Sequence, residues 1–400
     1  MTMQKMFAGE FPWDERYRVA DEQAVLTPAL AVYPEIIASN IEAMLRLLDG
    51  DPDRWRVHIK TAKLGYTLGM LIASGVRNFK CATTLELLVA CETGAQDVLV
   101  AYPMVGQNAR RVREIAGQFR KVRISILAEN EEQLRQWAGS GVGVFLDINP
   151  GMNRTGIEQE RKEEAVRLVR TAAGAGAEFR GLHYYDGQYG GLGEAERTMA
   201  TEPGYQHLLR MAAEIERDGV PVPEVITAGT PTLGCSLAFP GFRGRKFVHR
   251  VSPGTVVYGD ATSMAQLPPQ WGLRPAVLVL SQVVSHPCAG KVTSDAGHKA
   301  VSADAGVPTC VAVGHPELSA LPPSEEHLPF AVEGRDREPR VGQMLYLLPR
   351  HVCPTVNNFD SALLVRGGRV QSVEKVSARG HEGPLEQNLE QTAPLGAGCA

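Results

Sequence analysis

The stretch FKCATTLELLVACETGAQDVLVAY, residues 79–102, decides the fold, because it holds one complete strand–helix–strand unit. A short apolar run at 79–83 is followed by a helix-like pattern that ends at Gly94, and then by a second apolar run at 97–102. Glycine commonly ends a helix, and short apolar runs on either side of a helical period indicate two parallel strands joined by that helix. The unit therefore predicts an α/β protein with a parallel sheet.

The same alternation extends from about residue 28 to residue 260. Eight strands alternating with helices favour a (β/α)8 barrel of the TIM type over residues 26–262. An open doubly wound sheet is the alternative, but no G-x-G-x-x-G motif follows the first strand. The predicted strands are ALAVY (29–33), RVHIK (56–60), FKCAT (79–83), DVLVAY (97–102), RISILA (123–128), VGVFLDI (142–148), FRGLHYY (179–185) and EVITAG (224–229).

The pattern of apolar and polar residues changes after residue 262. Strand-like runs broken by Gly, Pro and Asp replace the long helical periods, which predicts a second, β-rich domain over residues 263–380. Residues 1–25 precede the first predicted strand, and they could join this second domain. The segment 381–400 is polar, rich in Gly and Pro and without period, so we expect a disordered tail.

Composition excludes several classes of protein. The chain has 400 residues, of which 44% are hydrophobic and 22% charged, and a formal net charge of −4, so nothing suggests a nucleic acid partner. Seven scattered cysteines do not resemble a disulfide framework and favour a reducing cytoplasm. No apolar run is long enough to span a membrane, and the N-terminus lacks the apolar core of a signal peptide.

Three segments carry residues suited to one cofactor. Reactive groups of such a barrel lie at the carboxyl ends of its strands, which is where WRVHIKTAKLG places Lys60. A lysine there is either a solvated charge or an amine poised to attack a carbonyl. Arg154 follows a later strand and can hold an anionic oxygen, and Gly229 and Thr230 form a turn that suits a phosphate. An amine, an arginine and a phosphate nest together suit pyridoxal 5'-phosphate.

Nine further segments strengthen this interpretation. HIKTAK resembles the cofactor-lysine motif of the D-threonine aldolase / D-serine dehydratase family, which comprises fold-type III pyridoxal phosphate enzymes related to alanine racemase. The resemblance covers about residues 25–378 and implies a barrel, a β domain and a homodimer. Other blocks stand in the family order: LTPALAVY, CATTLELLVA, VLVAYPMVG, LDINPGMNRTG, GLHYYDGQ, AGTPT, SPGTVVYGD, SDAGHKAVSAD and LPRHVCPTVN.

The resemblance implies a role for several single residues. Lys60 matches the catalytic lysine that forms a Schiff base with the cofactor, and Arg154 matches the arginine facing the cofactor ring oxygen. Tyr185 matches a tyrosine of the cofactor pocket, whereas Gly229, Thr230 and Tyr258 match the phosphate region. Gln188 stands where members of the family commonly carry histidine.

The segment PRHVCPTVNNFD, residues 349–360, supplies candidate metal ligands. His351 and Cys353 would point the same way on a strand, and Pro354 opposes a helix. A buried cysteine beside a solvated histidine is the alternative, but the cofactor motifs favour a divalent metal. Thiolate and imidazole favour zinc over manganese or magnesium. The resemblance assigns both residues to a metal that binds the substrate hydroxyl.

Cys353 also bears on the reaction. The dehydratase branch of the family resembles H-x-C at this position and the aldolase branch H-x-D. We therefore expect a cytoplasmic lyase that acts on a small D-3-hydroxy amino acid, of the D-serine or 3-hydroxy-D-aspartate dehydratase type, and releases a 2-oxo acid and ammonia. Retro-aldol cleavage to glycine and an aldehyde, as in D-threonine aldolase, is the alternative. An amino-acid racemase and a non-catalytic carrier of pyridoxal phosphate remain as further alternatives.

Overall fold

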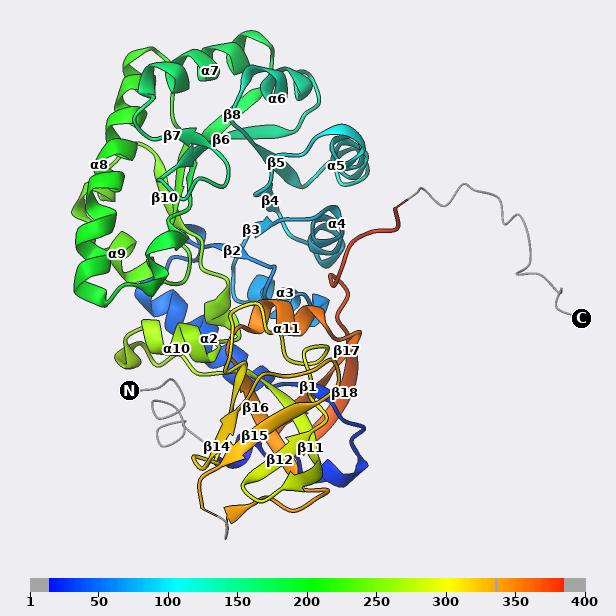
Figure 1. Cartoon of the computed structure of the whole chain (residues 1–400). Helices are drawn as coiled ribbons and strands as arrows, with labels where there is room; N and C mark the ends of the chain where they lie inside the picture. Colours follow the sequence, from blue (N-terminus) through cyan, green and yellow to red (C-terminus); the bar gives the residue numbers. More distant parts are fainter. Residues whose placement is uncertain (1–13, 335–336, 385–400) are drawn as a thin grey trace, which may run out of the picture.

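A computed structural model describes residues 14–334 and 337–384. Figure 1 shows one half built around a parallel sheet ringed by helices, and another half built from β-strands. Residues 385–400 of the tail predicted at 381–400, and residues 1–13, lie outside the described residues.

The parallel sheet is the predicted barrel. Its strands follow the order β10-β9-β8-β6-β5-β4-β3-β2, and a parallel bridge between Trp55 and Val251 joins the last strand to the first. The predicted fold class is therefore confirmed. The strands are β2 (Arg56–His58), β3 (Asn78–Cys81), β4 (Asp97–Val100), β5 (Arg123–Ala128), β6 (Gly143–Asn149), β8 (Glu178–Tyr184), β9 (Glu224–Thr227) and β10 (Val248–Val251), with a short β7 (Ile157–Glu158) beside β6.

Helices cover the outside of the barrel (Figure 1). Their buried faces are apolar and belong to the main hydrophobic core, whereas their outer faces are exposed. They are α2 (Pro34–Leu47), α3 (Gly65–Ala73), α4 (Thr84–Thr93), α5 (Gly106–Gln118), α6 (Glu131–Gln136), α7 (Lys162–Gly174), α8 (Glu194–Arg217), α9 (Leu233–Ala238) and α10 (Ala261–Gln266).

Two strands differ from the sequence prediction. The run ALAVY, predicted as the first barrel strand, forms β1 (Ala29–Val32) of the other sheet, where it pairs with β11 and β17. The eighth barrel strand is instead β10, with the sequence VHRV. Two of its four residues are polar and only Val251 is buried, so β10 lacks the apolar run that marks a buried parallel strand.

The second sheet is mixed, and β1 lies inside it. β1 pairs antiparallel with β11 and parallel with β17. Its other strands are β11 (Val277–Cys288), β12 (Lys291–Ser294), β13 (Cys310–Ala312), β14 (Leu318–Ala320), β15 (Leu328–Val332), β16 (Met344–Pro349), β17 (Ser361–Arg366) and β18 (Arg369–Lys375), and α11 (Val352–Asn357) joins β16 to β17.

The segment before β1 packs on this second half. The Tyr17 hydroxyl donates to the carbonyl of Pro275 at 2.8 Å, and the backbone N–H of Ala20 donates to that of Gly368 at 2.8 Å. These contacts agree with grouping the described residues 14–25 with the β-rich half. The division of the chain at residues 26–262 and 263–380 stays a prediction.

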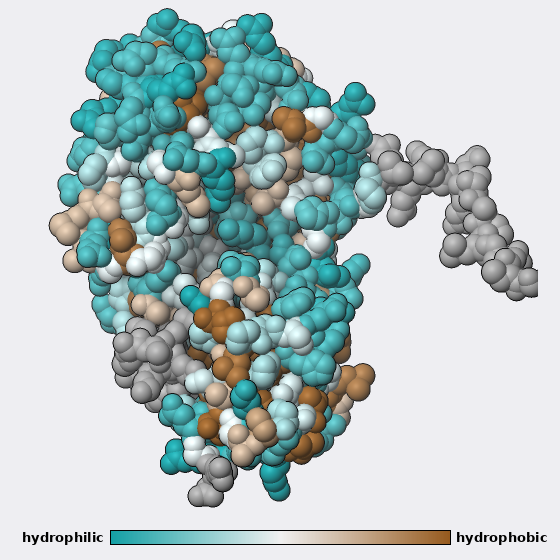
Figure 2. Space-filling view, in the orientation of Figure 1, coloured by the Kyte–Doolittle hydropathy of each residue, from teal (hydrophilic) through white to brown (hydrophobic). Residues whose placement is uncertain are grey.

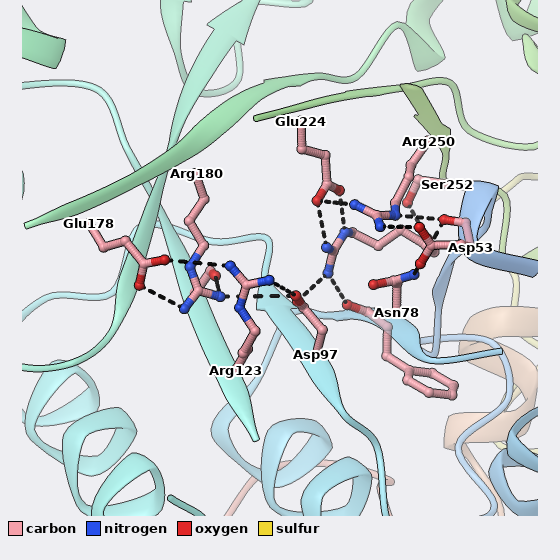
Figure 3. A network of polar contacts seen from close by, with 12 residues as sticks. Asp53, Asn78, Asp97, Arg123, Glu178, Arg180, Glu224, Arg250 and Ser252 are labelled. Atoms are coloured by element: carbon pink, nitrogen blue, oxygen red, sulfur yellow. Dashed lines mark hydrogen bonds and ion pairs between the residues drawn. The ribbon is translucent and has the colours of Figure 1, made fainter. Parts of the chain in front are cut away.

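Buried charges fill the amino-terminal end of the barrel (Figure 3). Arg56 is fully buried and donates to Glu224 at 2.7 and 2.9 Å and to Asp97 at 2.7 Å. Arg180 lies beside them and donates to Ser125 at 3.0 Å. An apolar layer of Leu99, Leu127, Phe145 and Ile226 follows along the strands. The barrel is thus a packed core, and its open end lies at the carboxyl ends of the strands.

The two halves differ in surface character. Figure 2 shows mainly hydrophilic residues over the barrel half, whereas hydrophobic residues gather over parts of the β-rich half. Leu26 is 92% exposed and Val373 is 63% exposed. Within residues 14–334 and 337–384, none of the helices combines the length and hydropathy that a bilayer-crossing segment needs.

Candidate active site

Lys60 and Lys63 lie three residues apart but in different surroundings. Lys63 is buried, and its amine forms an ion pair with Glu86 at 2.6 Å. Lys60 is half-buried just beyond the end of β2, and its backbone N–H donates to Nδ1 of His58 at 3.3 Å. Among the described residues, no acceptor lies within hydrogen-bond distance of the Lys60 amine. Lys60, and not Lys63, therefore has an amine available to a cofactor.

Tyr185 brings several predicted residues together beyond the end of β8. The guanidinium of Arg154 lies 4.9 Å from the centre of the Tyr185 ring, and the amine of Lys80 lies 5.8 Å from it. Gly229 packs against the same ring, since a Cβ atom at position 229 would lie 2.7 Å from Cε2 of Tyr185. Tyr185 thus lies against both Arg154 and Gly229, which the sequence analysis assigned to one cofactor pocket.

The turn after β9 presents free backbone donors. Ala228 has a φ of +62°, a left-handed conformation that costs an alanine about 1 kcal/mol, and it turns the chain sharply at the strand end. Gly229 and Thr230 follow, both buried. Neither of their N–H groups has an acceptor within residues 14–334 and 337–384. Buried unpaired donors at a barrel mouth fit the phosphate of pyridoxal phosphate.

Tyr258 is completely buried, and its hydroxyl is hydrogen-bonded to Thr67 at 2.8 Å. Burial raises the pKa of Tyr258 well above its usual range. The hydroxyl fixes α3, the helix that follows Lys60. Its predicted contact with a phosphate stays a prediction.

The predicted strand conformation of the metal pair is wrong. β16 ends at Pro349, and α11 begins at Val352, so His351 is the residue before the helix and Cys353 lies in its first turn. Pro354 is compatible with this conformation, because the first turn of a helix leaves N–H groups unpaired in any case. The buried Asp260 holds the start of α11 through a hydrogen bond of 3.0 Å from the N–H of Val352.

The two side chains nevertheless interact, and they do so at the barrel mouth. Sγ of Cys353 lies 3.0 Å from Oγ1 of Thr61, the residue after Lys60. Burial favours a neutral Cys353 thiol, but a hydrogen bond with His351 and the charge of Lys60 outweigh it and lower the pKa of Cys353. The arrangement therefore favours a thiolate, which is the form that binds a metal.

Asp304 orients the histidine of this pair. Its Oδ2 lies 2.6 Å from Nδ1 of His351, which leaves Nε2 for Cys353 or a metal ion. Burial favours the neutral imidazole, yet hydrogen bonds with Cys353 and Asp304 raise the pKa of His351 to about 9. The described residues include no group of three or more His, Cys, Asp or Glu that could hold a metal. His351 and Cys353 thus fit an open metal site, in which water and substrate complete the ligand shell.

Gln188 lies in the short 3-10 helix Gly187–Gly191 that follows β8. Its amide nitrogen donates to the carbonyl of Pro150 at 3.0 Å. Its amide oxygen is buried and has no partner among the described residues. A buried oxygen without a donor can accept a hydrogen bond from a bound molecule.

Sequence reasoning missed a buried chain of polar side chains below the pocket. Asp147 on β6, His183 on β8 and Lys80 on β3 are all buried and linked by hydrogen bonds. Each lies in a predicted strand, and its inward direction follows from the alternation of side chains. The three partners lie on strands far apart in the sequence, so no local pattern could bring them together.

Comparisons with known proteins match both halves of the chain. Residues 33–262 match the family described as "Alanine racemase, N-terminal domain", and residues 276–365 match the one described as "Putative serine dehydratase domain". A D-threonine aldolase of an Arthrobacter species is 26% identical over 366 residues, which cover 88% of this chain and 93% of that protein. A D-threo-3-hydroxyaspartate dehydratase of a Delftia strain is 23% identical over 380 residues, covering 88% of this chain and 97% of the relative.

A solved structure extends this similarity to three dimensions. The crystal structure of D-threonine aldolase from Filomicrobium marinum superposes with a TM-score of 0.80 at 27% identity. The superposition covers 89% of this chain and 96% of that one.

Proposed function

The chain belongs to the alanine racemase N-terminal domain family, within the D-threonine aldolase / D-serine dehydratase group of fold-type III pyridoxal phosphate enzymes, and we propose that it is a pyridoxal phosphate- and metal-dependent lyase of D-3-hydroxy amino acids. One observation carries the proposal. The free amine of Lys60 and the His351–Cys353 pair meet through the contact of Thr61 with Cys353. An amine that can hold the cofactor therefore lies near two side chains that can hold a metal. This arrangement suits a reaction at two adjacent carbon atoms, the α- and β-carbons of an amino acid.

Each predicted residue has a role in this proposal. Lys60 holds the cofactor and, once free, takes the proton from the substrate α-carbon. Arg154 and Tyr185 hold the cofactor ring, and the N–H groups of Gly229 and Thr230 hold its phosphate, with Tyr258 supporting them. His351 and Cys353 hold the metal. When bound, the cofactor withdraws electrons from the α-carbon, and the metal supplies Lewis acidity at the β-hydroxyl.

Zinc is the metal we propose, because a thiolate and an imidazole are ligands that zinc prefers over manganese or magnesium. The same cysteine favours loss of water over cleavage of the carbon–carbon bond, which gives a dehydratase of the D-serine or 3-hydroxy-D-aspartate type. D-threonine aldolase activity is the second candidate. It is favoured by the similarity to the Arthrobacter and Filomicrobium aldolases.

We also propose a homodimer in the cytoplasm. Exposed Leu26 and Val373 line one groove of the β-rich half together with Phe359, Leu363 and Val370, and a second subunit would cover these apolar side chains. All cysteines within the described residues are free, which fits a reducing compartment.

The decisive experiment supplies purified, cofactor-loaded protein with D-serine, D-threonine and D-3-hydroxyaspartate. A 2-oxo acid with ammonia supports the dehydratase, and glycine with an aldehyde supports the aldolase. Each assay is repeated after removal of metal with a chelator and again after zinc is restored. Full activity in a metal-free sample would exclude the metal from the reaction, and no product from any of the three would exclude the proposed substrate class.

The metal ligands are tested by Cys353→Ser, with Cys288→Ser as the matched control, because Cys288 is an exposed free cysteine far along β11. We expect Cys353→Ser to lose bound zinc and at least tenfold in activity, while its cofactor absorbance stays. Cys288→Ser should retain both. Equal zinc content in the two variants would contradict the assignment of Cys353.

A further inference from the structure

One buried carboxylate joins the barrel half to the helix that carries the metal pair. Asp260 is the residue before α10 and is only 2% exposed. Its Oδ1 accepts a hydrogen bond from the N–H of Ser263 at 2.7 Å, and its Oδ2 accepts one from the N–H of Val352 at 3.0 Å. Asp260 therefore pairs free N–H groups in the first turns of two helices, α10 of the barrel half and α11 of the β-rich half.

A second contact holds the residue before His351. Thr262 donates to the carbonyl of Arg350 from its hydroxyl at 2.8 Å and from its backbone N–H at 3.3 Å. The two neighbours of His351 in the chain, Arg350 and Val352, are thus both fixed to the start of α10. Cys353 follows Val352 directly, so each metal ligand is next to a residue that the barrel half holds.

The charge of Asp260 has no counter-charge in the described part of the chain, because no lysine, arginine or histidine there forms an ion pair with it. Burial raises the pKa of Asp260, and the hydrogen bonds it accepts and the charge of His351 only partly offset this. A buried carboxylate without an opposite charge is unfavourable. A cation held by His351 and Cys353 would stabilise it.

Asp260 fixes what Asp304 cannot. Asp304 lies in the β-rich half, as α11 does, so its contact of 2.6 Å with Nδ1 of His351 orients the ring but not the helix against the barrel. Asp260 joins the two halves instead. Sγ of Cys353 reaches Thr61 of the barrel half at 3.0 Å only while the first turn of α11 stays in this place.

We propose that Asp260 is a positioning residue for the metal pair, which holds the first turn of α11 against the barrel so that His351 and Cys353 share one ion. The metal role of these two residues rests on the function proposed above. Without the bond from Val352, the turn is free to move away from the barrel. The pair then binds a metal more weakly, as happens when the outer partner of a metal ligand is removed.

Zinc affinity, measured without substrate, tests this role. Cofactor-loaded protein is freed of metal, and zinc binding is then followed by competition with a chromophoric chelator. We expect Asp260→Asn to bind zinc roughly 10–100-fold more weakly, because an amide offers one oxygen acceptor where the carboxylate offers two. Ser263→Ala is the matched control. It loses the hydroxyl contacts with Asp260 but keeps the bond from Val352, and should bind zinc as the unmodified protein does.

Cobalt gives a second readout, which a loss of stability alone would not change. The ligand-field absorbance of bound cobalt, at wavelengths longer than the cofactor band, reports how the ligands are arranged. We expect it to change in Asp260→Asn and to stay the same in Ser263→Ala. Unchanged zinc affinity in Asp260→Asn, or an equal loss in Ser263→Ala, would overturn the proposal.

Thr262→Val decides the matter if Asp260→Asn does not fold, because it removes only the hydroxyl bond to the carbonyl of Arg350. We expect this variant to bind zinc more weakly than Ser263→Ala does. Equal zinc affinities in these two variants would then overturn the proposal.

The same titration separates this proposal from the proposed function. Cys353→Ser shows whether the zinc is held by the metal pair. If the unmodified protein holds no zinc that Cys353→Ser loses, the metal assignment fails and the role of Asp260 fails with it. If it holds such zinc, the variants at positions 260, 262 and 263 decide the role of Asp260 alone, whichever D-3-hydroxy amino acid reacts.

Discussion

At the scale of single residues, the candidate site depends on which polar groups lack a partner. Lys63 is neutralised by Glu86, whereas the amine of Lys60 has no acceptor among the described residues. The N–H groups of Gly229 and Thr230 are buried and have no acceptor in the described parts of the chain either. Buried polar groups are nearly always hydrogen-bonded, so unpaired ones gathered at one barrel end indicate the place of a ligand.

Lys60→Ala tests this interpretation directly. We expect the purified variant to lose the visible absorbance of lysine-linked cofactor, because alanine has no amine with which to form the covalent bond. The absorbance spectrum of protein incubated with pyridoxal phosphate and then desalted is the measurement. Lys246→Ala, at an exposed lysine, is the control and should retain the spectrum. An unchanged spectrum in Lys60→Ala would assign the cofactor to another lysine.

Only some residues of the candidate site could be predicted from the sequence. Lys60, Arg154 and the Gly229 turn follow strand ends, and strand ends can be recognised from local patterns. Asp304 and Lys80 could not be identified in this way. Asp304 contacts His351, which lies 47 residues away in the sequence, and Lys80 contacts His183, which lies 103 residues away. Such pairs become visible only when the fold brings the strands together.

At the scale of elements, β10 shows what a strand needs in order to be predicted. Its residue His249 bonds to Oγ1 of Thr227 at 2.7 Å and stacks on Phe242 with ring centres 4.1 Å apart. These contacts make a polar strand stable, but none of them can be read from the sequence VHRV. The prediction of α11 failed for a related reason, since Pro354 excludes the middle of a helix and not its first turn.

His249 gives this strand a pH-dependent stability. Burial lowers its pKa to about 3, so the folded protein keeps the ring neutral while the unfolded chain binds a proton below about pH 6.5. The contribution is complete above pH 6.5 and is lost as the pH falls toward 3. At pH 5 the loss should be about 2 kcal/mol.

Urea denaturation at pH 7 and pH 5 measures this loss. We expect His249→Gln to show a smaller difference between the two pH values than the unmodified protein, although it is less stable at pH 7. His327→Gln, at an exposed histidine of the β-rich half, should leave the difference unchanged. If His249→Gln keeps the full pH dependence, other groups cause it.

At the scale of the whole molecule, the two ends of the barrel serve different purposes. The amino-terminal end holds charged groups that are paired, as Figure 3 shows, and the carboxyl end holds the unpaired groups of the candidate site. The apolar layer of Leu99, Leu127, Phe145 and Ile226 separates them. Alternating side chains on parallel strands produce this layering, which is why the barrel itself could be predicted from the strand pattern.

Arg56→Met tests the ion pairs at the amino-terminal end of the barrel. Arg56 is fully buried, and its removal leaves Glu224 and Asp97 without their main partner, so we expect a loss of about 3–5 kcal/mol in the free energy of unfolding. Arg123→Met is the matched control, because Arg123 lies at the edge of the same network and is 62% exposed. Its loss should stay below about 1 kcal/mol. Similar losses for the two arginines would contradict a buried ion-pair core.

β1 ties the two halves of the molecule together, although the sequence places it with the barrel. It lies between β11 and β17, so both of its edges are hydrogen-bonded, and the chain then runs directly into α2 on the barrel. Ala31 in its middle is completely buried. A carboxylate there would have no counter-charge and would cost several kcal/mol, about the whole stability of many domains.

We therefore expect Ala31→Asp to lower the unfolding temperature by about 10 °C or more, or to prevent folding. Because α11 follows β16 of the same sheet, the variant should also lose metal binding at the proposed site before it loses the barrel, which circular dichroism and metal content measured together will show. Val284→Asp, at an exposed position of β11 outside the apolar groove, should change neither. An Ala31→Asp variant that unfolds at the normal temperature would mean that β1 is not a central strand, and the metal pair would then need another explanation for its place against Thr61.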